Sequence, residues 1–456
     1  MYPPEAHSPA ARTNFALFAV VALPVLAFVL LQYLGLLSLA RLAVLGAVAG
    51  VLGLSFFVRP RLGIYFMLFH VYAGLSFYLP GFVPLAVMAT VLSATLLDCV
   101  GGGRLYLRDA GFLWAVALFA IIALQSILWA RDPYFSFVAF SQFAKAAALV
   151  FLIVQFIRTP EDLRAYGWWI FVGAVATVAL GVVNLKLGLE TRIHAMGGVG
   201  IVRFAGAHAN PNYAAAIMIS AIPMGVFAIR YTSTVVGRLA AAAGVVTLTV
   251  GVFATFSRSA LFAFAFVALA VLLREVRSRK TYLGVLIVLL VGVLLTPKYY
   301  WIRLGSLGGM GETLQHDWSL MMRMKALGTS WDLFTQHPLA GVGLNNFIVR
   351  SADDMLIRIG VHNLYLEILC GVGIIGFLAY AAIHYAALKQ LVGGIRAAWA
   401  PSDAWIGRFS YYLMIAFIST LISGLFASDE FNYMIWVPVA GALAIGNLRR
   451  GLTAGG

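Results

Sequence analysis

The sequence contains few charged residues. Of its 456 residues, 11% are Asp, Glu, Lys or Arg, whereas 62% are hydrophobic. A soluble chain of this length has too little interior to bury that much apolar surface, so the composition excludes an ordinary water-soluble protein. Acidic residues are the scarcer kind, with 17 against 31 basic ones, which leaves a formal charge of +14.

Cysteine is also scarce, and common metal-binding motifs are missing. The two cysteines, Cys99 and Cys370, fall in or beside apolar segments, so we expect no disulfide framework. The sequence has neither an HExxH nor a CxxC spacing. His208, His316 and His362 could be proposed as zinc ligands, but without such spacing we expect no metal site.

Long apolar runs fill most of the chain. A helix of roughly 20 apolar residues crosses the hydrocarbon core of a membrane and satisfies its own backbone hydrogen bonds. The N-terminus lacks the basic region and cleavage site of a signal peptide, so we expect its first apolar run to be retained. The sequence predicts an all-α polytopic membrane protein with about 12–14 transmembrane helices. The spans are placed near 15–37, 41–58, 62–79, 83–98, 110–130, 136–157, 166–186, 211–229, 239–256, 259–273, 281–297, 363–388, 408–427 and 433–448.

The distribution of basic residues predicts the orientation. If the N-terminus is inside, every second loop carries at least two cations, whereas the short loops between them carry one or none. Because basic loops stay on the cytoplasmic side, we expect both termini in the cytoplasm. The net charge then reflects the anionic cytoplasmic leaflet, and we expect no nucleic-acid partner. The basic loops hold Arg59, Arg61, Arg104, Arg108, Arg158, Arg164, Arg230, Arg238, Arg274, Arg277, Arg279, Lys280, Lys389, Arg396, Arg408, Arg449 and Arg450.

Two loops on the opposite side are long and basic. Because the bias of basic residues towards the cytoplasm applies to short loops, these two do not change the expected orientation. One lies near 187–210, and the larger covers 298–361, where "WSLMMRMKALGTSWDLFTQHPL" has helical periodicity. We therefore expect three parts: transmembrane helices over 1–297, a large and partly helical periplasmic loop over 298–361, and C-terminal transmembrane helices over 362–456.

Three helices that begin on this outer side open with polar residues. Asn210 can cap the first. Ser257 or Ser259 can cap the second, which starts beside Arg258, and His362 with Asn363 opens the third. A helix N-terminus attracts anions, and an adjacent arginine adds donors suited to phosphate oxygens. Arg258 is therefore a candidate phosphate ligand, although an arginine there can also reach lipid headgroups or pair with a carboxylate.

Other polar residues near these helix starts are weaker candidates. Arg203 and Arg323 lie in the two basic outer loops and could bind the same anion. His362 fits either a capping role or that of a general base, because an imidazole can accept a proton near neutral pH. Glu367 is costly in lipid and should face the protein interior, where it could tune His362, although a five-residue spacing puts the two off a common helix face.

The His362 segment matches a known pattern. His362 and Asn363, nine further residues, Gly373, two more and Gly376 resemble the signature of the bacterial O-antigen ligases. "FSRSALF" and "QHPLAGVGLNNF" resemble segments of the wider superfamily of ligases, O-antigen polymerases and O-oligosaccharyltransferases. The resemblance covers the stretch from 256 to 377.

The resemblance implies a GT-C-like glycosyltransferase that needs no metal or other cofactor. It would transfer O-antigen from undecaprenyl pyrophosphate to a sugar hydroxyl of lipid A–core on the periplasmic face of the inner membrane, with inversion. His362 would be the general base and Arg258 the first essential arginine. Arg323 is our choice for the second, with Arg303 as competitor, and Arg203 could assist. Asn363, Asn210 and Glu367 would support them.

Three other functions remain open at this stage. An O-antigen polymerase uses the same donor with a second lipid-linked chain as acceptor, and a protein O-oligosaccharyltransferase uses a protein. A membrane transporter belongs to another class, and interior charges such as Lys145 could line its pathway. The clustering of the unusual residues at one surface favours a transferase.

Overall fold

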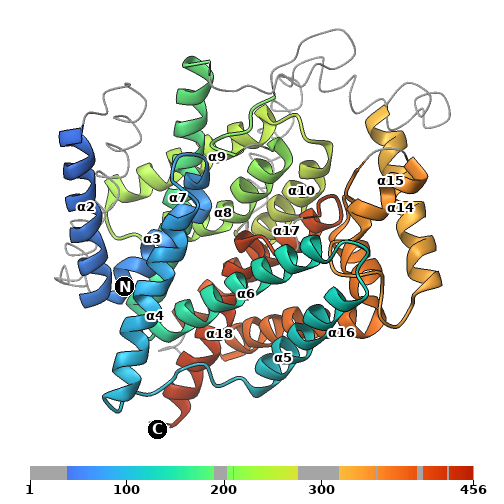
Figure 1. Cartoon of the computed structure of the whole chain (residues 1–456). Helices are drawn as coiled ribbons and strands as arrows, with labels where there is room; N and C mark the ends of the chain where they lie inside the picture. The colour runs from blue at the N-terminus through green and yellow to red at the C-terminus, as the bar shows by residue number, and fades with distance from the viewer. Residues whose placement is uncertain are drawn as a thin grey trace.

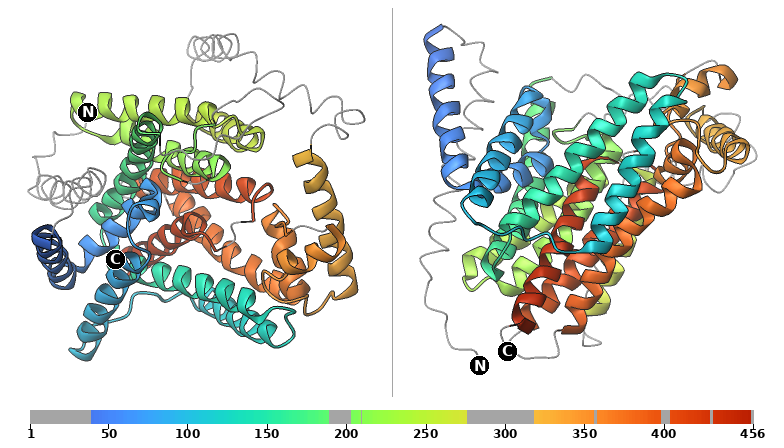
Figure 2. Two further views of the ribbon diagram at one scale, coloured as in Figure 1. Left: turned by 45° about the horizontal axis from the view of Figure 1, so that its top comes forward. Right: turned by 60° about the horizontal axis from the view of Figure 1, so that its bottom comes forward.

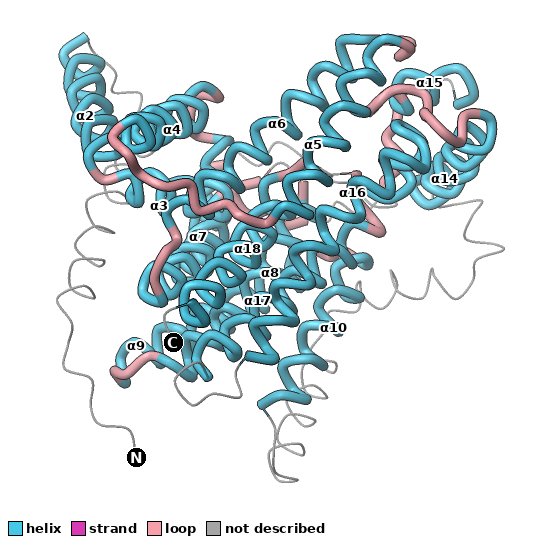
Figure 3. The backbone as a smooth tube through the Cα atoms, turned by 90° about the horizontal axis from the view of Figure 1, so that it is seen from below, coloured by secondary structure: helices cyan, strands magenta, loops and turns pink. Residues whose placement is uncertain are grey.

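The computed structural model describes residues 39–188, 203–208, 210–275, 318–355, 358–397, 404–428 and 431–454. Within these ranges the chain forms helices joined by loops and contains no strand (Figure 3). The all-α fold is confirmed. The predicted spans near 15–37 and 281–297 lie outside the described residues, as do Arg277, Arg279, Lys280, Arg303 and His316.

Each predicted span within the described ranges corresponds to a helix (Figure 1). The helices are α2 (Leu39–Val58), α3 (Pro60–Ala73), α4 (Phe82–Val100), α5 (Ala110–Gln125), α6 (Pro133–Phe156), α7 (Pro160–Lys186), α8 (Pro211–Tyr231), α9 (Val235–Ala254), α10 (Arg258–Glu275), α14 (Trp318–Gln336), α15 (Phe347–Met355), α16 (Leu364–Ala397), α17 (Ala404–Gly424) and α18 (Tyr433–Ala454), with single 3₁₀ turns η1 (Leu75–Phe77) and η2 (Ser126–Leu128).

Eight of the described helices are long and apolar enough to cross a membrane, which confirms a polytopic membrane fold. The helices α2 and α3 meet at an angle of 120°. If the two together form a single broken span, the number of candidate spans is nine. The prediction treated them as two separate spans. Arg59 occupies the break, and Pro60 begins α3, where a proline fits the first turn but would interrupt a continuous helix.

The loops rich in arginine meet at one end of the bundle. Arg61 pairs with Asp162 at 3.3 Å, which joins the start of α3 to the start of α7. Arg158 lies 4.0 Å from the centre of the Tyr106 ring in the loop between α4 and α5. Further contacts at this end join Arg230 to Glu275, Arg164 to Trp405, Arg408 to Tyr231, and Asn447 to the carbonyl of Tyr106.

At the other end, α14 and α15 lie beside the start of α16, away from the C-terminus (Figure 2). A small apolar cluster fixes them there. It consists of Met322, Ala326, Val342, Phe347, Val361 and Cys370. Because Met322 belongs to this cluster, its neighbour Arg323 is held near the segment that leads into α16.

The loop between α14 and α15 packs against a break in α16. Gly373 has a φ of 67° and a ψ of −174° inside the helix. The freed carbonyls of Cys370 and Gly371 accept hydrogen bonds from the N–H groups of Val342 and Gly343, both at 2.9 Å. A Cβ at Gly373 would stand 2.3 Å from the Leu339 carbonyl, so this position requires glycine for both its φ and its close contact.

Candidate active site

Arg203 joins the end of α9 to the start of α8. Its Nε donates to the Thr255 carbonyl at 2.9 Å, and the Phe204 N–H donates to the Ala254 carbonyl at 3.1 Å. A cation is stabilised there because the last carbonyls of a helix have no partner within it. The Nη2 of Arg203 donates to Asn212 at 3.0 Å, in the first turn of α8.

The start of α8 is capped as the sequence predicts. Asn210 has extended backbone angles, and its side chain accepts a hydrogen bond from the Asn212 N–H. Pro211 follows in the first helical turn. The remaining N–H groups of this turn stay free of helical partners, which gives this end a positive potential.

Arg258 is the first residue of α10 and is half-buried. The hydroxyl of Ser257 accepts from the Ala260 N–H at 3.3 Å and lies 3.0 Å from the Ser259 hydroxyl. Of the two serines considered as caps, Ser257 therefore has this role. The starts of α8 and α10 thus both present a capped, positively polarised N-terminus.

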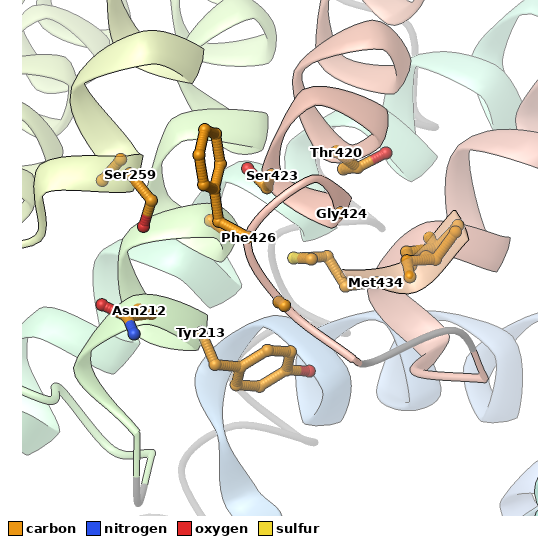
Figure 4. A pocket seen from close by; sticks show the side chains of 13 residues that line it. Asn212, Tyr213, Ser259, Thr420, Ser423, Gly424, Phe426 and Met434 are labelled. Carbon is orange, nitrogen blue, oxygen red and sulfur yellow. The ribbon is translucent and has the colours of Figure 1, made fainter. Parts of the chain in front are cut away.

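A small pocket lies between these two helix starts (Figure 4). Asn212 and Ser259 come from α8 and α10, and they face the end of α17, where Ser423 and Phe426 lie. Its volume of about 20 Å³ holds roughly one water molecule. Leu364 at the start of α16 lines the same pocket, so all three predicted helix starts meet here.

His362 has an unusual backbone conformation, with a φ of 56°. Two side chains hold the segment. The His362 N–H donates to the Ser428 hydroxyl at 2.7 Å, and the Val361 N–H donates to the Glu367 carboxylate at 3.2 Å. Ser428 also lies close to the Glu367 carboxyl. Glu367 is buried, as predicted, and its 3.2 Å bond goes to the backbone of Val361.

Asn363 caps α16. Its side-chain oxygen accepts from the N–H groups of Tyr365 and Leu366, both at 3.0 Å. Its amide nitrogen donates to the Leu425 carbonyl at 3.2 Å, which ties the cap to the end of α17. The asparagine of the signature thus serves the backbone, while the histidine beside it is half-buried and lies outside the helix.

Electrostatics keep the imidazole neutral. Burial, and secondly the positive charge of Arg323, lower the pKa of His362 from its ordinary value. Met322 and Val361, the chain neighbours of Arg323 and His362, pack in one apolar cluster, which brings Arg323 near His362 although the two are distant in sequence. A neutral imidazole retains a nitrogen lone pair that can accept a proton.

The sequence agrees with a known family over this region. Residues 243–381 match the model of the O-antigen ligase family. This match confirms the resemblance drawn from the His362 segment. The matched residues run from α9 into α16 and include Arg258, Arg323 and His362. No curated protein sequence matches the chain significantly.

The match implies a glycosyltransferase-type enzyme of O-antigen assembly with a GT-C-like membrane fold. Together with the apolar helices, it indicates a multi-pass protein of the bacterial inner membrane that works on lipid-linked glycans. Arg203 lies outside the matched region, but its hydrogen bonds connect it to the helix that precedes Arg258.

Sequence reasoning missed two groups at this site. Ser428 lies in the loop "ASDEFNY", one of the short loops without cations, and Asn212 is two residues beyond the predicted cap of α8. Their contacts join segments far apart in the chain, so no local pattern marks them. Among the described residues, no three His, Cys, Asp or Glu side chains gather as a metal site.

Proposed function

We propose that this protein is an O-antigen ligase, which transfers O-antigen polysaccharide from undecaprenyl pyrophosphate to a sugar hydroxyl of lipid A–core and so completes lipopolysaccharide. The observation that carries the proposal is the neutral His362 beside Arg323, at the same end of the bundle as the starts of α8 and α10. This end lies opposite the basic loops, so it faces the periplasm if the cytoplasmic loops are the basic ones.

The pyrophosphate must be bound before the sugar can leave it. Arg258 and Arg323 bind its oxygens, and the N-termini of α8 and α10 add positive potential. Arg203 supports this site by positioning Asn212 and by its own charge. These groups stabilise the negative charge that develops on the leaving group, as an oxyanion hole does in other enzymes.

His362 acts as the general base. It removes the proton from the acceptor hydroxyl as the oxygen forms its bond to the anomeric carbon and the bond from that carbon to the pyrophosphate oxygen breaks. Attack from the face opposite the leaving group inverts the anomeric configuration. Undecaprenyl pyrophosphate departs, and the imidazolium later returns its proton to solvent. General-base catalysis of this kind contributes about 10²–10⁴-fold.

The test is transfer by the purified protein. Undecaprenyl-pyrophosphate-linked O-antigen and lipid A–core are supplied, and product is followed as a ladder on a gel for wild type, His362→Ala and Arg258→Ala. Laddered lipopolysaccharide from wild type alone supports the ligase. Lengthening of the lipid-linked chain without the core acceptor would instead identify a polymerase. If neither assay gives a product, a transporter becomes the remaining candidate.

A further inference from the structure

A second cavity lies beside the proposed site. It has a volume of about 450 Å³ and opens between α3, α6, the start of α8 and the loop from α17 to α18. This volume falls within the range of about 300–1,000 Å³ typical of small-molecule sites. Tyr213 lines both this cavity and the small pocket at the start of α8, and Ser428 connects it to the backbone of His362.

The lining of this cavity is about half polar and carries no formal charge among its described residues. Amides and hydroxyls from five different parts of the chain face it, together with the rings of Phe431 and Tyr433. The polar ones are Ser76, Gln142, Tyr213, Asn345, Ser428 and Asn432. A pyrophosphate requires cations, so this lining does not suit it, whereas uncharged amides, hydroxyls and aromatic rings suit a neutral sugar.

Two histidines in the cavity have ring nitrogens without a partner. His70 is 1% exposed, its Nε2 lies 3.2 Å from the Ser76 hydroxyl, and its Nδ1 is buried with no hydrogen bond. The Nε2 of His208 is likewise buried without one. Burial, and then the neighbouring His70, lower the pKa of His208 to about 3, so its ring is neutral. Because these two nitrogens are buried, a ligand in the cavity does not reach them, and the two rings line the cavity as uncharged surface.

We infer that this cavity is a saccharide-binding subsite, which holds neutral sugar residues of a substrate next to the reacting centre through Gln142 and Asn345. The inference rests on the proposed function, since it places the sugars of that same reaction. The pyrophosphate stays with the arginines, and Tyr213, which donates to Asn432, stands between the two parts.

The experiment measures lipid binding by the purified full chain. Three probes are used: undecaprenyl pyrophosphate, the same lipid carrying one N-acetylglucosamine, and lipid A–core. Gln142→Leu removes an amide from the cavity. Asn345→Gly removes another without backbone strain, because Asn345 has a φ of 55°. Ser141→Ala is the matched control, since the Ser141 hydroxyl donates to the Val138 carbonyl of its own helix.

Both cavity variants should bind a sugar-bearing probe about tenfold more weakly, while Ser141→Ala and the affinity for undecaprenyl pyrophosphate stay unchanged. A loss with the N-acetylglucosamine lipid assigns the subsite to the donor, and a loss with lipid A–core assigns it to the acceptor. Unchanged affinity for both sugar probes, or an equal loss with bare undecaprenyl pyrophosphate, overturns the saccharide subsite but leaves the proposed function intact. If wild type binds no pyrophosphate lipid, the proposed function fails as well.

Discussion

His362 has a backbone conformation that a β-carbon disfavours. Its φ of 56° lies in the left-handed region, where a residue other than glycine typically costs about 1–3 kcal/mol. The hydrogen bonds from Val361 to Glu367 and from His362 to Ser428 hold the segment in place. An imidazole retained at such a position is expected to serve the reaction, because glycine would satisfy the backbone better.

Two substitutions of His362 separate its catalytic role from this strain. Both His362→Gly and His362→Ala remove the base, and we expect each to lose about 10²–10⁴-fold in transfer rate. Only alanine keeps a β-carbon, so His362→Gly should be more stable than His362→Ala by about 1 kcal/mol. Transfer assays and thermal unfolding of the purified variants measure the two effects. Near-normal transfer by either variant would contradict the assignment of the base.

Arg323 contributes to the pH dependence. Burial, and secondly the charge of Arg323, lower the pKa of His362, so the neutral base persists at pH values below 6.5. Transfer should fall as pH drops through this lowered pKa. In Arg323→Gln one of the two causes is gone, so the pKa rises and the acidic limb of kcat/KM moves to higher pH, in addition to a lower rate from weaker pyrophosphate binding.

The control for this effect is Lys325→Gln, which removes a more exposed cation from the same helix. Its acidic limb should coincide with that of wild type. A limb that stays in place in Arg323→Gln, or moves equally in both variants, would show that Arg323 does not act on His362.

At the scale of elements, the break in α16 fixes the loop between α14 and α15 against that helix. Gly373→Ala would place a Cβ 2.3 Å from the Leu339 carbonyl at a φ of 67°, so we expect a loss of several kcal/mol of stability or failure to fold. Gly328→Ala is the control, because a Cβ there meets nothing within 4 Å, and it should stabilise α14 by about 0.5–1 kcal/mol. Thermal unfolding in detergent compares the two, and equal melting temperatures would refute this account of the break.

The cap of α16 predicts a graded series. Asn363→Ala removes the acceptor of two N–H groups and the donor to Leu425, and should cost about 1 kcal/mol or more of stability. Asn363→Asp keeps the cap but loses the donor, so its stability should lie between alanine and wild type. Thermal unfolding measures the stability of the three proteins. An order other than wild type, Asn363→Asp, Asn363→Ala would show that capping does not explain the asparagine of the signature.

The sequence predicts the elements well where the signal is local. Apolar runs located every span within the described ranges, and the cap at Asn210 follows from residue type beside a helix start. For α16 the sequence considered His362 for a capping role, whereas Asn363 is the cap. The break at Gly373 and its pairing with Val342 did not follow, because they depend on a contact between distant segments. Gly373 was noticed only as part of a family signature.

At the scale of the whole molecule, the arginine-rich loops and the candidate active site lie at opposite ends of the helix bundle. The sequence grouped the starts of α8, α10 and α16 from topology alone, and the pocket between Asn212, Ser259 and Leu364 shows that they meet. The second cavity did not follow from the sequence. His70 lies in the middle of an apolar segment, and its meeting with His208 depends on the packing of the end of α3 against the loop before α8.

The orientation of the molecule can be measured by labelling single cysteines. Cys99→Ser and Cys370→Ala remove the two native thiols, both of which are free. Gly81→Cys is then added in the loop before α4, at the His362 end, where a Cβ meets nothing within 4 Å. Ser233→Cys is added in the exposed loop before α9, at the basic end, as its matched counterpart.

A membrane-impermeant maleimide applied to intact spheroplasts should label Gly81→Cys and leave Ser233→Cys unlabelled until the membrane is permeabilised. The reason is that the arginine-rich loops remain in the cytoplasm, which places His362 and both cavities on the periplasmic side. The opposite pattern would put His362 on the cytoplasmic face, where a reaction with substrates exposed to the periplasm is impossible, and the proposed ligase would fail with it.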